Sequence, residues 1–152
     1  MFRRSTRLDD VDALVEEECG ERIPAIFARH GEDYFRSCES RILARLAQNP
    51  SPSVIATGGG IVVRPENRAL LASSGTSVYL SVEPSSAIAR MQSQHAASLA
   101  QGHTPEVRPL LSGPDHLSHL QALLATRLAW YHEAEIHCST QGKSAEQVVQ
   151  EI

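Results

Sequence analysis

Apolar side chains recur along this chain with two alternating periods. A period near 3.6 residues predicts amphipathic helices at 9–18, 23–31, 32–48, 65–75, 83–102 and 116–134. A capping box of Ser144 with Gln147 predicts a last helix at 144–152. Short β-branched or apolar runs predict strands at 53–57, 77–82 and 135–140. Helices that alternate with short strands indicate an α/β domain with a parallel sheet.

Two of these helices have a clearly defined apolar face. In 32–48 this face consists of Tyr34, Cys38, Ile42, Leu43 and Leu46. In 9–18 the same spacing holds for Val11, Leu14, Val15 and Glu18, and the aspartates Asp9 and Asp10 suit a helix start. We therefore expect both helices to pack against a common core.

The composition is that of an ordinary globular domain, with 41% hydrophobic and 21% charged residues. The length fits a single domain over 1–152, with residues 1–7 as a flexible tail and the Pro- and Gly-rich stretch 102–115 as a loop. A net charge of −4 argues against nucleic acid and anionic membrane as partners, and no apolar run approaches the ~18 residues of a membrane span. The N-terminus has no apolar core of a secretory signal, and the three cysteines form no C-x-x-C pair, so we expect a cytoplasmic protein without a zinc site.

The stretch "SVIATGGGIV" runs a predicted strand into three glycines, but it is not a nucleotide-binding loop. It lacks the last glycine of a Rossmann fingerprint and the lysine of a Walker A loop. The one Gly-Lys-Ser triplet, at 142–144, has His137 where a Walker A loop needs glycine, and only eight residues follow it. We interpret that triplet as a strand-to-helix turn with Ser144 as the N-cap.

Two explanations for the glycines at 58–60 remain open at this point. Glycines at a strand end let main-chain N–H groups approach a ligand, and in open α/β sheets ligands bind beyond the carboxyl ends of the strands. Alternatively, the glycines form a tight turn that needs a positive φ.

Several charged residues are candidates for a binding site, although each alone is typical of a solvated surface. Asp10 and Asp12 are two carboxylates spaced by one residue. Arg36 and Glu39 lie at i,i+3 on one helix face, where they can pair. Arg108 lies in the predicted loop, and Arg127 lies among apolar helical residues.

Taken in order, these motifs resemble those of the shikimate kinase family. The order is D-x-D at 10–12, G-E-x-x-F-R-x-x-E at 31–39, T-G-G-G at 57–60, R-P-L-L at 108–111 and R-x-x-x-Y at 127–131. The resemblance covers Leu8 to Ile152. It implies a P-loop kinase-like, three-layer α/β domain that phosphorylates the 3-hydroxyl of shikimate with ATP and Mg²⁺, in the biosynthesis of aromatic amino acids.

The resemblance also implies roles for individual residues on the acceptor side. Asp12 would bind a shikimate hydroxyl and accept its proton. Arg36 and Arg127 would clamp the substrate carboxylate, and Glu39 would orient Arg36. The glycines Gly58, Gly59 and Gly60 would offer a cradle of backbone N–H groups to the substrate.

On the nucleotide side, the resemblance implies two further roles. Arg108 would lie on a lid formed by 102–115 and would contact the transferring phosphate. Asp10 would sit near Mg²⁺, through water.

The resemblance implies a missing part as well. Family members begin with a strand, a G-x-x-x-x-G-K-[ST] loop and a helix, a unit of roughly 25–30 residues that precedes the D-x-D motif. The fold expected here therefore lacks the first, central strand, the phosphate loop and the first helix, which leaves the strands at 53–57 and 77–82 without the partner between them.

Three hypotheses follow from this departure. The first is a kinase whose given N-terminus is short, through a wrong start or a fragment. The second is a catalytically inactive shikimate-binding or regulatory module, and the third is an unstable relic. Oligomeric state is not predicted by the sequence.

Overall fold

The computed structural model describes residues 6–102 and 115–152. These residues form two compact units, Met1–Gly75 and Thr76–Ile152, each of which is described by itself. In both units helices follow short strands that pair in parallel, so the predicted α/β class is confirmed. The prediction of one domain over 1–152 stays a prediction.

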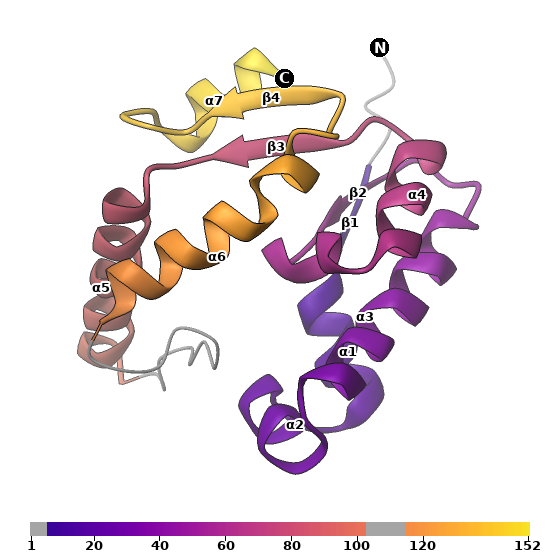
Figure 1. Ribbon diagram of the computed structural model, residues 1–152, viewed down its shortest axis with the longest axis horizontal. Coiled ribbons are helices and arrows are strands. Elements are labelled where there is room, and N and C mark those ends of the chain that lie inside the picture. Colours follow the sequence, from indigo (N-terminus) through magenta and orange to yellow (C-terminus); the bar gives the residue numbers. More distant parts are fainter. Residues whose placement is uncertain (1–5, 103–114) are drawn as a thin grey trace. The chain divides into compact units, whose positions relative to one another are not determined.

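The first unit has two strands, four α-helices and one 3-10 helix in its described part (Figure 1). In chain order they are β1 (Arg7–Asp10), α1 (Val11–Cys19), α2 (Ile23–His30), α3 (Glu32–Ala47), β2 (Ser53–Ala56), η1 (Gly59–Val63) and α4 (Pro65–Ser74). β1 pairs with β2 from Arg7↔Ser53 to Asp10↔Ala56.

Strand β1 corrects the sequence prediction, which began a helix at residue 9 and placed Arg7 in a flexible tail. Of the two aspartates expected at a helix start, only Asp10 is there. Asp9 lies within the strand, and Asp10 ends it as the N-cap of α1, where its Oδ1 accepts a hydrogen bond from the Ala13 amide at 3.2 Å. The segment "RLDD" carries one apolar side chain, Leu8, which is 70% exposed, so it shows no strand periodicity. Backbone pairing with β2 is what makes it a strand.

Three helices bury the core of the first unit against one another. The core consists of Val11 and Val15 of α1, Ile26 of α2, and Phe35, Cys38, Ile42 and Leu46 of α3. The predicted apolar face of α3 is confirmed except at Tyr34, which is 44% exposed. Phe35 is buried in its place, because its ring packs on Phe27 of α2 with ring centroids 4.9 Å apart.

The glycine segment is held by the residues that follow it. The Ile61 amide donates to the Gly58 carbonyl at 3.1 Å, which closes the first turn of η1. The buried Asn67 side chain donates to the Ile61 carbonyl at 3.0 Å, and Arg68 donates to the Val62 carbonyl at 2.7 Å. Helix α4 thus fixes the backbone that leaves β2.

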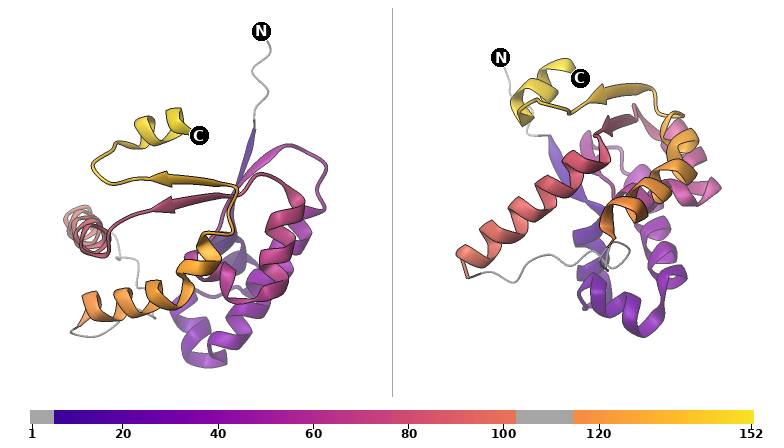
Figure 2. Two further views of the ribbon diagram at one scale, coloured as in Figure 1. Left: turned by 45° about the horizontal axis from the view of Figure 1, so that its top comes forward. Right: turned by 60° about the vertical axis from the view of Figure 1, so that its left-hand side comes forward.

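The second unit has two strands and three helices in its described part (Figure 2). They are β3 (Val78–Ser81), α5 (Pro84–Ala100), α6 (His116–Tyr131), β4 (Ile136–Ser139) and α7 (Ala145–Glu151). β3 pairs with β4 in parallel from Val78↔Ile136 to Ser81↔Ser139. The predicted capping box at the start of α7 is confirmed, since Ser144 accepts from the Gln147 amide and the Gln147 side chain accepts from the Ser144 amide.

Each described sheet therefore has two strands. β2 pairs with β1, and β3 pairs with β4. Apolar side chains on these strands remain accessible, with Val54 57% and Leu80 50% exposed. In the ranges that the structure describes, no helix is both long and apolar enough to cross a membrane.

Candidate functional site

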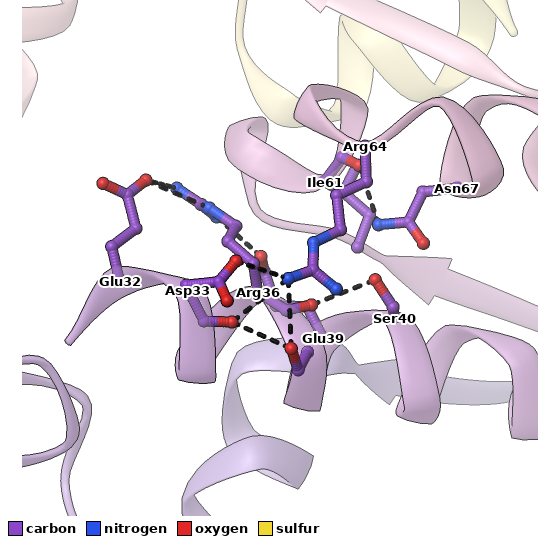
Figure 3. Close-up of polar contacts among 9 residues, drawn as sticks. Glu32, Asp33, Arg36, Glu39, Ser40, Ile61, Arg64 and Asn67 are labelled. Atoms are coloured by element: carbon purple, nitrogen blue, oxygen red, sulfur yellow. Dashed lines mark hydrogen bonds and ion pairs between the residues drawn. The ribbon is translucent and has the colours of Figure 1, made fainter. Parts of the chain in front are cut away.

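Helix α3 places a buried ion pair at the centre of the candidate site (Figure 3). The Arg36 side chain is 7% exposed and that of Glu39 is 1% exposed. Arg36 Nη1 lies 2.6 Å from Glu39 Oε2, so the predicted i,i+3 pair is confirmed. At this burial neither charge is stable without the other, because an uncompensated charge in the interior is strongly unfavourable.

Glu32 is a second carboxylate on Arg36, and the sequence analysis missed it. Its Oε1 accepts from Arg36 Nε at 3.2 Å and from Nη2 at 3.0 Å. The signal was present, because Glu32 precedes Arg36 by four residues on the same helix. Burial alone would lower the pKa of Arg36, but the bonds to Glu39 and Glu32 outweigh it, so this pKa is raised and the guanidinium stays charged.

The Arg36 guanidinium has more donors than the described contacts use. A guanidinium has five N–H donors. In the described contacts Glu39 accepts from one N–H of Nη1, and Glu32 accepts from Nε and from one N–H of Nη2. One donor on each terminal nitrogen is left, which is the number that a carboxylate needs for two parallel hydrogen bonds.

The glycine segment passes directly over this pair. A Cβ added at Gly60 would overlap Arg36 Nη1 and would lie 2.5 Å from Arg36 Cζ, so either the guanidinium or the glycine backbone would have to shift. A Cβ at Gly58 would lie 3.2 Å from Asp12 Oδ1 and 3.5 Å from Glu39 Oε1. The turn hypothesis is wrong, because neither glycine has a positive φ. Close approach is the reason for the glycines, and the groups that approach include the chain's own Asp12, Arg36 and Glu39.

Asp12 enters the site from the first turn of α1. It is half-buried, and its carboxylate faces Gly58 beside Glu39. Asp10, two residues earlier, uses Oδ1 as the helix N-cap. Over residues 6–102 and 115–152, no group of three or more His, Cys, Asp or Glu side chains could hold a metal ion, so the role of Asp10 near Mg²⁺ stays a prediction.

The remaining predicted residues are Gly59, Arg127 and Arg108. Gly59 begins η1. Arg127 is half-buried on α6 of the second unit. Arg108 lies outside the described residues. The structure thus brings together Asp12, Arg36, Glu39, Gly58 and Gly60. The binding roles of these residues, like those of Arg127 and Arg108, stay predictions.

The Gly-Lys-Ser triplet is a helix start, as predicted. Lys143 Nζ lies 2.6 Å from Glu151 Oε2 at the other end of α7, and Ser144 Oγ accepts from the Gln147 amide. Both side chains that a phosphate loop would use are therefore engaged within their own helix. The triplet does not fit a nucleotide-phosphate cradle.

Taken together, the first unit offers a charged guanidinium, the three nearby carboxylates of Asp12, Glu32 and Glu39, and a glycine backbone without side chains. These groups suit a small acid that also carries hydroxyls, because the guanidinium can bind the acid and the carboxylates can accept hydrogen bonds from hydroxyls.

The comparisons with known proteins agree with this chemistry. The family model described as shikimate kinase matches residues 4–152. The shikimate kinase of Symbiobacterium thermophilum is 41% identical over 144 residues, which is 94% of this chain and 77% of that protein. The shikimate kinase of Geobacter metallireducens is 37% identical over 150 residues, which is 99% of this chain and again 77% of the relative.

Solved structures give the same result for the fold. The shikimate kinase from Acinetobacter baumannii in complex with shikimate matches with a TM-score of 0.76 at 28% identity, over 96% of this chain and 75% of that one. The enzyme from Aquifex aeolicus matches with a TM-score of 0.68 at 31% identity, over 96% of this chain and 78% of that one. The predicted P-loop kinase-like α/β fold is confirmed by these neighbours. On the family match over nearly its whole length, this chain belongs to the shikimate kinase family.

Proposed function

We propose that this chain binds shikimate and provides the acceptor site for transfer of the γ-phosphate of ATP to the shikimate 3-hydroxyl. The observation that carries this proposal is the buried Arg36–Glu39 pair packed against Gly60. Shikimate has one carboxylate and several ring hydroxyls, which is the combination of groups that the site chemistry suits. A solved relative with a TM-score of 0.76 is described as a complex with shikimate, which supports the same ligand here.

Each acceptor-site residue has a defined role in this proposal. Arg36 binds the substrate carboxylate through its two remaining N–H donors, and Arg127 is the second arginine proposed to bind it. Glu39 holds the Arg36 guanidinium in place at 2.6 Å. Asp12 accepts a hydrogen bond from the reacting hydroxyl and takes its proton, which orients the nucleophile for phosphoryl transfer.

The glycines serve the same site in a second way. Since Gly58 and Gly60 leave room for Asp12, Glu39 and Arg36, they let three charged side chains meet under one turn of backbone. The N–H groups of Gly59 and Gly60 remain the proposed donors to the ring hydroxyls.

ATP and Mg²⁺ are the cofactors that family membership implies, and Mg²⁺ would neutralise charge on the phosphates during transfer. Asp10 and Arg108 are the residues of this chain proposed to face them. Among the described residues, the groups fit the acceptor better than the nucleotide, because the Gly142–Ser144 triplet is used as a helix start.

Titration calorimetry with shikimate, combined with an assay for ATP-dependent product, tests the proposal. We expect the chain to bind shikimate, and Arg36→Lys to weaken binding about 10- to 100-fold, because lysine keeps the charge but loses the fork that binds a carboxylate. Arg22→Lys is the matched control, since Arg22 is 75% exposed and contacts Glu16 instead. Equal affinities in the wild type and Arg36→Lys contradict the site assignment.

The two assays also distinguish an active kinase from a protein that only binds shikimate. Shikimate binding accompanied by ATP-dependent phosphorylation supports the kinase. Binding without any product supports the second hypothesis, a catalytically inactive shikimate-binding or regulatory module. No binding in a protein that unfolds cooperatively on heating contradicts both.

A further inference from the structure

Two cysteine thiols of the first unit lie in contact although they are far apart in sequence. Cys19 is the last residue of α1, and Cys38 lies in the middle of α3. Their Sγ atoms are 3.8 Å apart, and both are reduced. Helices α1 and α3 run close together here (Figure 1). A disulfide bond is about 2.05 Å long, so the two sulfur atoms need to approach by roughly 1.8 Å to form one.

The two thiols differ in ways that suit a two-step exchange. Cys38 is completely buried, whereas Cys19 is only half-buried and is followed by Gly20, which ends α1 in a left-handed conformation with φ 67°. An incoming reagent therefore meets Cys19 first. Arg41 Nη2 donates a hydrogen bond to Cys38 Sγ at 3.4 Å.

The surroundings also favour the protonated form of the Cys19 thiol. Burial, and after it the neighbouring Cys38, raise the pKa of Cys19. The two cysteines in turn raise the pKa of the Tyr34 hydroxyl, which lies beside them. Because the thiolate is the reactive species, the pair reacts slowly with oxidants. It is oxidised only during prolonged exposure to an oxidising disulfide.

We propose that Cys19 and Cys38 form a redox-modification site, which a small disulfide of the glutathione type converts to an intramolecular disulfide that joins α1 to α3. The Cys19 thiolate attacks the reagent disulfide, forms a mixed disulfide and releases one reagent thiolate. The Cys38 thiolate then attacks the Cys19 sulfur and releases the second reagent thiolate. Two protein thiols lose two electrons and two protons, and one reagent disulfide becomes two thiols.

The bond would act on the acceptor site because both helices contribute to it. α1 carries Asp12, and Cys38 lies between Arg36 and Glu39 on α3. These three side chains fit closely against Gly58 and Gly60, so a shift of either helix disturbs the fit. This part rests on the proposed function, and we expect the oxidised protein to bind shikimate more weakly by roughly fivefold or more.

The experiment is a thiol count before and after incubation with oxidised glutathione. The protein is unfolded, alkylated with a maleimide and weighed by mass spectrometry. We expect the wild type to lose two of its three alkylatable thiols and to gain no glutathione mass, and dithiothreitol to restore all three. Cys138→Ser, which changes the thiol of the second unit, should lose both of its remaining thiols.

Two variants test the pairing itself. Cys19→Ser and Cys38→Ala should each keep Cys138 and either retain the remaining thiol or carry it as a glutathione adduct, without an internal bond. Cys19→Ser is the safer of the two for folding, because Cys19 is half-buried at a helix end. Three alkylatable thiols in the oxidised wild type, or an internal bond that survives in Cys19→Ser, overturns the proposal.

Shikimate titration of the reduced and oxidised forms tests the coupling separately. An internal bond with unchanged shikimate affinity overturns the coupling between bond and site. An internal bond in a chain that binds no shikimate in either state contradicts the proposed function and leaves the redox site supported.

Discussion

Gly60 is required by a neighbouring side chain and not by its own backbone angles. Its φ is not positive, and the space that a Cβ would need is filled by the Arg36 guanidinium. Arg36 cannot simply move aside, because it is bonded to both Glu39 and Glu32. The absence of one side chain therefore permits a buried ion pair to lie beneath the turn.

A graded set of alanine substitutions tests this explanation. Gly60→Ala should lower the free energy of unfolding by about 1–3 kcal/mol, the range for overpacking, and should weaken shikimate binding. Gly58→Ala should cost less, since its Cβ would lie 3.2 Å from Asp12 Oδ1 and a small shift relieves the contact. Gly75→Ala is the control, with an extended backbone and no atom within 4 Å. Urea unfolding measures all three, and equal losses at positions 60 and 75 would contradict the argument.

At the scale of single residues, the sequence predicted which charged side chains pair better than it predicted which positions have no room for a side chain. The Arg36–Glu39 pair could be predicted because helix geometry alone places i and i+3 side chains together. The reason for the glycines could not be predicted from the sequence in the same way. Whether a Cβ at Gly60 meets a ligand, a turn or Arg36 depends on how α3 packs beneath η1, and no local pattern encodes that packing.

At the scale of elements, Arg64 joins the turn after the glycines to the start of α3 (Figure 3). Its Nη2 donates to the Asp33 carbonyl at 3.2 Å, to the Asp33 carboxylate at 2.8 Å and to Ser37 Oγ at 3.0 Å. The Asp33 side chain is 97% exposed, so the ion pair itself contributes little in water. The bonds to the carbonyl and to Ser37 are the ones that connect the two elements.

Replacing Arg64 should therefore make the position of Arg36, the arginine proposed to bind shikimate, less well defined. We expect Arg64→Met to reduce the free energy of unfolding by about 1–2 kcal/mol and to weaken shikimate binding by a smaller factor than Arg36→Lys does. Asp33→Asn keeps the hydrogen bonds and removes only the charge, so it should cost less than about 1 kcal/mol. Denaturant titrations compare the two variants. If Asp33→Asn costs as much as Arg64→Met, the ion pair and not the neutral bonds joins the elements.

Elements with a repeating side-chain pattern were predictable, and β1 was not. Helix α3 buries seven residues at helical spacing, so its periodicity identifies it. Strand β1 has the sequence "RLDD", and its exposed Leu8 gives no alternation. Its last residue, Asp10, is a real helix-start signal, because it is the N-cap of α1, and so the local pattern indicated a helix rather than a strand. Pairing with β2, 46 residues later in the register, is a tertiary property that a local pattern does not reveal.

At the scale of the whole molecule, the order of motifs carried more information than any single motif. The five motifs extend across both compact units, from the D-x-D at 10–12 in the first to the R-x-x-x-Y at 127–131 in the second. Family membership, which they predicted, is confirmed. The two arginines proposed to bind the substrate carboxylate divide in the same way, since Arg36 belongs to the first unit and Arg127 to the second. Whether one shikimate molecule contacts both arginines is therefore the question that decides how the molecule works.

Hydrogen exchange with and without shikimate answers this question directly. Helix α6 has no fully buried residue, so its amides should open readily in the free protein and report sensitively on any new contact. We expect shikimate to slow exchange in α1, α3 and η1, and also in the part of α6 around Arg127. Arg127→Lys should remove the protection of α6 and weaken that of α3, whereas Arg90→Lys, which changes a side chain bonded to Thr140 at 2.7 Å, should alter neither. Protection confined to the first unit would contradict a role for Arg127 and leave Arg36 as the arginine that binds the carboxylate.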